Sequence, residues 1–315
     1  MATYKGIKGV KVVTKTSDPT ATEAIGTVWY NSTSPSALKY AIQGAGNWSA
    51  GGALLTARTS GGAATASVSD SICAGGYPGP ATVISETYDG TSWTEGNNLN
   101  TGRHFPRAFG TSSAALIMGG ETPSLTNKTE SYNGTCWGEV NLMNTARYMM
   151  GAAGIQTLGI IAAGGPGTKS EVETWDGTSW TETTNVNTAK NYLWGAGTST
   201  SEIVGGGPPG TGTESWDGTS WTEVADPNVN HGAGGGAGTS NTSALIFGGD
   251  NPAKKNNAES WDGTSWTAVN AMANARAYLG SGGTTVSTLG INQNPGTAVE
   301  EWEDPVYTIK TVTVS

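Results

Sequence analysis

The fold is decided by the stretch Glu214-Ser215-Trp216-Asp217-Gly218-Thr219-Ser220-Trp221-Thr222. Its Asp-Gly pair predicts a tight turn between two short strands, because a type I′ turn needs positive φ at both central positions. Trp216 and Trp221 lie on either side of the turn, as aromatic anchors of a strand pair would. Closely similar stretches occupy residues 86–93, 130–137, 173–180 and 259–266. The chain is therefore a repeat protein.

The composition favours strands over helices. The 315 residues include 48 glycines and 12 tryptophans, and only 13% of them are charged. Threonine, serine, glycine, valine and aromatic residues dominate, which is typical of strands and turns. The tryptophans lie nearly all at repeat positions, which argues against a disordered chain. The sequence thus predicts an all-β domain, of a length that such domains reach without splitting.

The charge distribution disfavours several partners. The formal net charge is −9, and four lysines precede the first acid, Asp18: Lys5, Lys8, Lys11 and Lys15. The main body is more acidic than the total, so we expect no nucleic-acid partner. No apolar run is long enough to span a membrane, and the N-terminus lacks the apolar core of a signal peptide. We therefore expect synthesis in a cytoplasm and no membrane partner.

A ten-residue spacing sets the phase of the repeat. Ten positions after each repeat tryptophan lies a basic or imidazole residue. The pairs are Trp48 with Arg58, Trp93 with Arg103, Trp137 with Arg147, Trp180 with Lys190, Trp221 with His231 and Trp266 with Arg276. A Gly/Ala-rich segment follows each base, and then an apolar strand that ends in a glycine doublet in the first five copies. Six copies at one spacing indicate six structural units.

Each unit of about 44 residues predicts four strands, a to d, as in one propeller blade. Strand a is the Gly/Ala segment beside a central channel, strand b is apolar and buried, and strands c and d form the aromatic hairpin. We predict a six-bladed β-propeller that closes, because an open ring would expose sheet edges. Either the segment around Trp48 or residues 306–312 supplies the outermost strand of the last blade, built from residues 275–303. The first is preferred, because Trp48 keeps the ten-residue phase.

The predicted organisation has three parts. Residues 1–37 form an arm and hairpin for anchoring or oligomerisation, residues 38–305 form the propeller, and residues 306–315 form a C-terminal strand or tail. The six repeat tryptophans are interpreted as structural.

Glycine-doublet strands followed by an aromatic residue, a tight turn and a tryptophan resemble kelch repeats over residues 48–303. The aromatic-to-tryptophan spacing is shorter than the usual kelch spacing, and this form is similar to kelch-like proteins of bacteria and their tailed phages. Trp29-Tyr30-Asn31-Ser32-Thr33, followed by Leu38-Lys39-Tyr40 and Trp48, resembles a segment of phage virion proteins, with marine cyanophage structural and tail-fibre proteins as the nearest comparison. The resemblance implies a virion component.

Two enzyme classes share the propeller architecture. A sialidase-like hydrolase has Ser-x-Asp-x-Gly-x-x-Trp boxes, which Ser215-Trp216-Asp217-Gly218 misses by one position, and it needs three clamping arginines. Four of the five arginines, Arg58, Arg103, Arg147 and Arg276, hold the repeat-phase position, so pairing with the strand-c glutamates or capping of strand ends is the preferred interpretation.

A galactose-oxidase-type copper enzyme needs two histidine ligands and a Tyr–Cys crosslink. The two histidines are His104 and His231, and His231 holds the phase position. Cys73 lies in an apolar strand and Cys136 in a turn, where two separate thiols are preferred over a disulfide. No phosphate loop, nucleophile elbow or metal-ligand spacing is recognisable. We therefore expect no catalytic residues, no metal and no cofactor.

Binding remains as the expected activity. The b–c and d–a loops of a blade lie at one end, and they vary between units, whereas the c–d turns are nearly identical. The candidate binding residues at the variable end are Tyr77, His104, Arg107, Tyr148, Tyr192 and Tyr278. Their rings fit stacking on sugars or packing on protein. The alternative, that Tyr148, Tyr192 and Tyr278 plug the channel mouth, is slightly preferred.

The sequence therefore predicts a non-enzymatic structural protein of a phage virion, in a tail fibre, another appendage or a capsid decoration. The expected partners are other virion proteins through the N-terminal arm, further copies of the chain in a homo-oligomer, and host-surface polysaccharide in host attachment. A carbohydrate-active propeller enzyme and a bacterial kelch-like adhesin are the alternatives.

Overall fold

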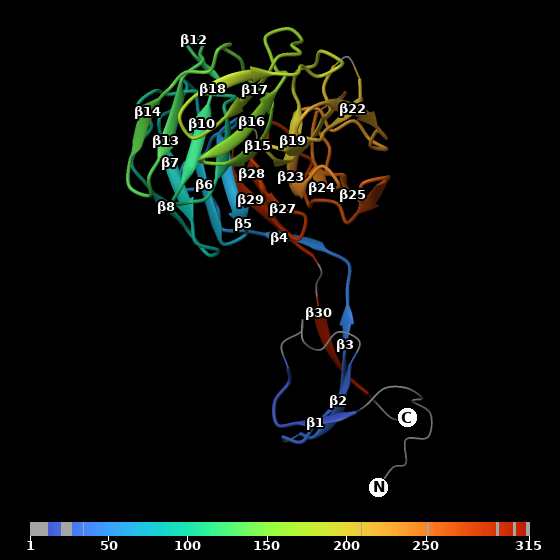
Figure 1. Ribbon diagram of the computed structural model, residues 1–315. Coiled ribbons are helices and arrows are strands. Elements are labelled where there is room, and N and C mark those ends of the chain that lie inside the picture. Colours follow the sequence, from blue (N-terminus) through green and yellow to red (C-terminus); the bar gives the residue numbers. More distant parts are fainter. Residues whose placement is uncertain are drawn as a thin grey trace. The chain divides into compact units, whose positions relative to one another are not determined.

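The computed structural model describes residues 12–19, 27–33, 35–208, 210–250, 252–293, 296–304 and 307–312 (Figure 1). All elements in these ranges are β-strands. The chain divides into two compact units, Asn47–Glu303 and Met1–Gly46 with Asp304–Ser315. Some residues named above lie outside the described ranges, namely Lys5, Lys8 and Lys11 of the arm and Val306 of the C-terminal segment.

The larger unit is propeller-like. Its described part holds six four-stranded sheets. The first three are β5 (Gly62–Ser67), β6 (Asp70–Ala74), β7 (Ser85–Tyr88) and β8 (Trp93–Glu95); β9 (Arg107–Gly110), β10 (Ala115–Met118), β13 (Thr129–Tyr132) and β14 (Trp137–Val140); and β15 (Gly151–Ile155), β16 (Leu158–Ala162), β17 (Val172–Trp175) and β18 (Trp180–Thr183). A two-stranded ribbon, β11 (Glu121–Thr122) with β12 (Ser124–Leu125), lies between β10 and β13 in the chain.

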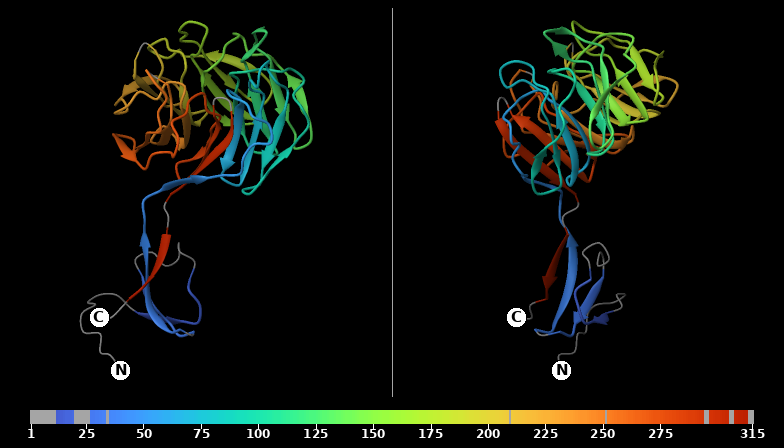
Figure 2. Two further views of the ribbon diagram at one scale, coloured as in Figure 1. Left: turned by 180° about the vertical axis from the view of Figure 1, so that it is seen from behind. Right: turned by 90° about the vertical axis from the view of Figure 1, so that its left-hand side faces the viewer.

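The other three sheets repeat the order. They are β19 (Trp194–Thr198), β20 (Ser201–Gly205), β21 (Thr213–Trp216) and β22 (Trp221–Val224); β23 (Gly235–Ser240), β24 (Ser243–Phe247), β25 (Ala258–Trp261) and β26 (Trp266–Val269); and β27 (Gly283–Thr284), β28 (Ser287–Gln293), β29 (Gly296–Glu303) and β4 (Asn47–Ala50). The innermost strands contact one another in succession, from β5 through β9, β15, β19, β23 and β27 to β5 again. Figure 2 shows β27–β29, in orange and red, beside the blue β5 and β6.

Strand β4 supplies the outermost strand of the last sheet. It pairs antiparallel with β29 in the register Trp48↔Trp302. Of the two alternatives that the sequence left for this position, the preferred one is confirmed. The competing C-terminal segment, β30 (Tyr307–Thr311), pairs instead with β3 (Ala37–Gln43) of the smaller unit.

The smaller unit holds one sheet, in the order β1 (Val13–Lys15), β2 (Val28–Asn31), β3 and β30. Residues 38–46, assigned to the propeller by the sequence, and the C-terminal segment both lie in this unit. The Asp18 carboxylate accepts hydrogen bonds from Trp29 Nε1 (3.1 Å) and Asn31 Nδ2 (2.7 Å) and pairs with Lys39 Nζ (2.6 Å). The hydrogen bond from Lys39 is the largest of the contacts that lower the pKa of Asp18. One carboxylate thus connects β2 to β3.

The aromatic hairpins are present, but their turn type differs from the prediction. Trp216 pairs with Trp221, so four residues form the loop rather than two. φ is positive at Gly218 (95°) but not at Asp217, whereas a type I′ turn needs a positive φ at both positions. The Asp217 side chain instead accepts hydrogen bonds from the N–H groups of Thr219 and Ser220, both at 2.8 Å. The aspartate acts through its carboxylate, as in an Asx turn.

The glycine doublets mark the places where one repeat approaches the next. Gly119 has a φ of 65°, and a Cβ there would lie 2.3 Å from the carbonyl oxygen of Arg147, the base of the next repeat. The N–H of Gly120 donates to that same carbonyl (2.9 Å). Only glycine gives both the left-handed conformation and this contact at low cost.

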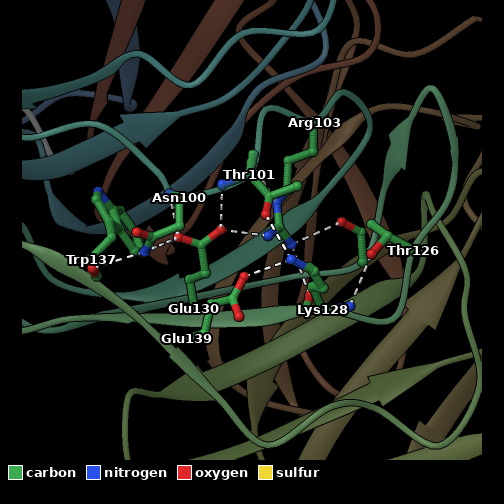
Figure 3. Close-up of polar contacts among 9 residues, drawn as sticks. Asn100, Thr101, Arg103, Thr126, Lys128, Glu130, Trp137 and Glu139 are labelled. Carbon is green, nitrogen blue, oxygen red and sulfur yellow. Dashed lines mark hydrogen bonds and ion pairs between the residues drawn. The ribbon is translucent and has the colours of Figure 1, made fainter.

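A buried base–glutamate pair joins the incoming d–a segment to strand c in each sheet, as Figure 3 shows for Arg103 and Glu130. Arg103 Nη2 lies 2.6 Å from Glu130 Oε1, and both side chains are fully buried. The same carboxylate accepts the N–H groups of Asn100 (2.7 Å) and Thr101 (3.2 Å). The other pairs are Arg58–Glu86, Arg147–Glu173, Lys190–Glu214, His231–Glu259 and Arg276–Glu300. The preferred interpretation of the phase-position bases is confirmed.

Cys73 is buried in β6 and Cys136 is exposed in a hairpin turn, and no disulfide joins them. The preference for two separate thiols is confirmed.

Trp48→Ala should cost about 3–5 kcal/mol of unfolding free energy, because it removes a large core side chain from β4. Trp48 is 7% exposed and packs against Phe247 and Trp302, with ring centroids at 4.8 and 5.5 Å. Leu55→Ala is the control, because Leu55 is 60% exposed, and it should change the stability by less than about 0.5 kcal/mol. Denaturant unfolding monitors both, and equal losses would contradict the role given to β4.

Glu130→Gln should cost about 3–5 kcal/mol, because it leaves the buried Arg103 cation without its counter-charge. Glu139→Gln is the matched control in the same sheet, also seen in Figure 3. Glu139 pairs with Lys128 at 2.6 Å, but the two side chains are 51% and 40% exposed. The loss there should be about 0–1 kcal/mol. A cost below about 1 kcal/mol for Glu130→Gln, measured by denaturant unfolding, would contradict a structural role for the pair.

Candidate functional site

The variable loops meet at one end of the larger unit. Isolated backbone bridges join d–a segments to b–c loops there, including Thr59 with Tyr77, His104 with Glu121 and Tyr148 with Gly165. These bridges bring together loops that the sequence had placed at the same end.

Six residues with left-handed backbone conformation surround the channel at this end. Each lies two positions after a phase-position base: Ser60, Phe105, Met149, Tyr192, Ala233 and Tyr278, with φ between 50° and 59°. Backbone hydrogen bonds connect successive segments: Phe105 N to Ser60 O, Met149 N to Phe105 O, Leu193 N to Met149 O, Ala233 N to Tyr192 O and Tyr278 N to Ala233 O, at 2.7–3.3 Å. We call these six residues the girdle.

The girdle carries a continuous group of aromatic rings. Phe105, Tyr148, Tyr192 and Tyr278 contact one another in a cycle, with successive centroid distances of 5.8, 6.3, 6.4 and 5.6 Å. His104 adjoins Phe105 (4.8 Å), and Tyr77 adjoins His104 (5.3 Å). We call these six residues the aromatic cluster. Tyr77 is 45% exposed and the others are partly exposed.

The structure thus brings together five of the six predicted binding residues. The sequence analysis missed Phe105, although its ring contacts His104, Tyr148 and Tyr278 and so joins the cluster. The sequence contained the information needed to include it, because Phe105 occupies the same repeat position as Tyr192. Each lies two positions after the base, Arg103 or Lys190.

Polar groups border the aromatic rings. His104 Nε2 lies 3.1 Å from Glu121 Oε2. Burial, with the neighbouring Tyr192, raises the pKa of Tyr148 to about 12, so its hydroxyl stays protonated at neutral pH. Burial and then Asp250 raise the pKa of Tyr278. His104 Nδ1 and Asn191 Oδ1 are enclosed without a hydrogen-bond partner. Apolar ring surface beside a few unpaired polar atoms is typical of sites that bind sugars or peptides.

Arg107, the sixth predicted residue, begins β9 and lines the channel instead of joining the ring contacts of the cluster. Its Nε donates to Met150 O (2.8 Å), Nη2 to Leu193 O (2.5 Å) and Nη1 to Leu279 O (3.4 Å). Burial lowers its pKa to about 10. The other repeats hold Gly62, Gly151, Trp194, Gly235 and Gly280 at the corresponding position.

A cavity of about 100 Å³ occupies the channel between the innermost strands. Glu202 lies behind the wall of this cavity. At the corresponding position the other repeats have a small residue, namely Ser71, Ala115, Gly159, Ala244 and Thr288. A Cβ on the lining residue Gly195 would lie 3.1 Å from Glu202 Oε1. Glu202 is fully buried, neither carboxyl oxygen has a hydrogen-bond partner, and burial raises its pKa well above the ordinary value. The sequence-based prediction did not include Glu202, although a glutamate stands there at a position where every other repeat has a small residue.

Within the described ranges no three His, Cys, Asp or Glu side chains lie close enough together to hold a metal ion. The described residues also contain no helix of the length and apolarity needed to cross a membrane.

Comparison with known proteins supports the fold and leaves the function open. No protein-family model matches the chain, and no curated protein matches it. Among solved structures, the one titled "Structure of YjhT" is similar with a TM-score of 0.65 and 13% sequence identity, over 82% of this chain and 99% of that chain. At this identity the likeness concerns the fold alone. The chain therefore has the fold seen in YjhT over most of its length.

Proposed function

We propose that this chain is a non-enzymatic structural protein of a tailed-phage virion, part of a tail fibre, another appendage or a capsid decoration. In this proposal the larger unit is a six-bladed, kelch-like propeller that β4 closes, and it contacts other virion proteins or a host-surface glycan. The smaller unit attaches it to the particle and to further copies of the chain.

The contrast between repeated and unrepeated side chains supports binding over catalysis. The repeated acids and bases neutralise one another in buried pairs, such as Arg103 with Glu130, and are engaged in the scaffold. The aromatic cluster at one end consists of side chains that do not recur in every repeat. A surface that varies on a regular scaffold is typical of recognition.

The smaller unit supports the attachment role. Its sheet combines segments from both ends of the chain, β1 to β3 and β30. Val12 and Val13 are each 45% exposed, and Tyr30 is 40% exposed. A single small sheet gains stability when its exposed apolar side chains pack against another surface. Other virion proteins and further copies of the chain would supply that surface.

A carbohydrate-active enzyme is the second candidate. The aromatic cluster that would hold a glycan for attachment would equally hold a substrate. The carboxyl of Glu202, whose pKa burial raises, pairs with Gly197 at the end of the channel opposite the cluster, so as a general acid it would serve a substrate that extends into the channel. The two candidates differ in whether a bound glycan is released unchanged.

The virion proposal is tested by quantitative mass spectrometry of gradient-purified particles from the source of the sequence. We expect a constant copy number relative to the major capsid protein across the particle fractions. A chain found only in the soluble fraction of lysed cells would overturn the proposal.

Tyr192→Ala and Tyr278→Ala should weaken binding of host-surface polysaccharide at least about tenfold each, because each removes one stacking ring worth about 1.4 kcal/mol or more. Tyr30→Ala, which removes an exposed tyrosine from the smaller unit, is the control and should bind as the wild type does. Equilibrium binding to polysaccharide from the host, together with analysis of the recovered glycan, provides the measurement. Equal affinities of all four proteins would remove the cluster from the proposal, and shortened glycan would favour the enzyme.

A further inference from the structure

We propose that the central channel of the larger unit binds a small oxyanion, a carboxylate or phosphate group, against the guanidinium of Arg107. This site differs from the aromatic cluster in its residues and in the chemistry that it recognises. It is independent of the virion proposal.

The charge of Arg107 has no partner of opposite sign in the cavity wall. Arg107 is the one charged side chain among the described residues that line the cavity. Its hydrogen-bond partners are carbonyl oxygens of Met150, Leu193 and Leu279, which carry no net charge. Arg107 is half-buried, and a half-buried cation without a counter-ion gains stability when an anion binds beside it. The phase-position arginines, by contrast, each have a glutamate partner, as Arg276 has Glu300.

Arg107 also has more hydrogen-bond donors than its carbonyl contacts use. A guanidinium has five N–H groups, and the three carbonyl contacts of Arg107 use three of them, one at the long distance of 3.4 Å. Two N–H groups therefore remain for a ligand. Paired N–H groups of one arginine match the two oxygens of a carboxylate or phosphate.

None of the other repeats has a charged residue at the position of Arg107. Four of the other five repeats have glycine there, namely Gly62, Gly151, Gly235 and Gly280. The fifth has Trp194, which is buried and packs against Trp266 at 5.5 Å. Arg107 thus breaks the repeat toward charge, and its three carbonyl contacts leave that charge without a counter-ion.

The cavity also has suitable size and walls. Its volume of about 100 Å³ can hold an anion of a few heavy atoms. Alanine and glycine of the innermost strands form most of the wall, including Ala152, Gly195 and Gly236. Glu202 is not among the lining residues, and it pairs with Gly197 at the end of the innermost strands opposite Arg107.

The position of Arg107 indicates the route of entry. The carbonyl groups that it binds belong to residues directly after the girdle residues Met149, Tyr192 and Tyr278, so it lies next to the girdle. The lining residues continue from there to Gly154, Gly197 and Gly238, near the opposite ends of the innermost strands. The anion would therefore reach Arg107 from the end that carries the a–b and c–d turns, away from the aromatic cluster.

The test uses the full chain and two probes, acetate and phosphate, each replacing chloride at constant ionic strength. We expect a saturable rise in the unfolding temperature with at least one probe. In Arg107→Met the half-saturating concentration should increase at least tenfold. Lys128→Met removes an exposed cation and should behave as the wild type does. Saturation with acetate alone would assign a carboxylate ligand, with phosphate alone a phosphate group, and with both an unselective oxyanion site.

The proposal is overturned if the wild type and Arg107→Met respond identically, or if Lys128→Met loses the response equally. Should Arg107→Met fail to fold, wild-type crystals soaked in selenate provide the second measurement. An anomalous peak within hydrogen-bond distance of the Arg107 guanidinium supports the site. A channel without such a peak at saturating selenate overturns it.

Discussion

The larger unit depends on a glutamate buried in strand c of each sheet. In the second sheet Glu130 neutralises Arg103 and accepts the backbone N–H groups of Asn100 and Thr101, so one carboxylate satisfies both a buried cation and the polar backbone of the segment that crosses between sheets. A buried ion pair alone can lose as much in desolvation as it gains in attraction. The additional N–H donors change that balance, because hydrogen bonds to a charged acceptor are about twice as strong as neutral ones. The pair therefore fixes where the chain enters each sheet.

The identity of the base can change as long as this arrangement is kept. His231 replaces arginine in the fifth sheet, with Nδ1 2.6 Å from Gly248 O and Nε2 3.2 Å from Glu259 Oε1. The two ring nitrogens therefore face a backbone carbonyl and the strand-c carboxylate, the same kinds of acceptor that Arg103 meets in Gly119 O and Glu130. Burial opposes ionisation of Glu259, but the hydrogen bonds from His231 and Asn228 outweigh it and lower the pKa of Glu259. The scaffold thus selects a nitrogen-bearing side chain that reaches the glutamate, and arginine, lysine and histidine all meet that requirement.

The sequence predicts what repeats and misses what departs from the repeat. The ten-residue spacing from tryptophan to base located the strands and indicated β4 as the partner of β29. It could do so because the tryptophan and the base recur at the same spacing in every repeat. The turn type at Asp217 was predicted wrongly, because an Asp-Gly pair is compatible with several turn types. The pair alone does not show that the aspartate carboxylate will accept backbone N–H groups. Phe105 and Glu202 were missed for a different reason. Each occupies a phased position where its neighbours in other repeats have different chemistry, so only the three-dimensional contacts show what the departure does.

The backbone of the girdle explains how its six positions can carry different side chains. A non-glycine residue in the left-handed conformation costs about 1–2 kcal/mol, yet all six girdle positions hold one. Ser60 and Ala233 share the conformation with Tyr192 and Tyr278, so the strain comes from the scaffold and not from the aromatic rings. The buried base two residues earlier and the hydrogen bonds between successive segments hold the backbone in place. Since the backbone is fixed whatever the side chain, each girdle position can vary in chemistry without loss of the fold, and the rings that it carries are presented in a preorganised arrangement.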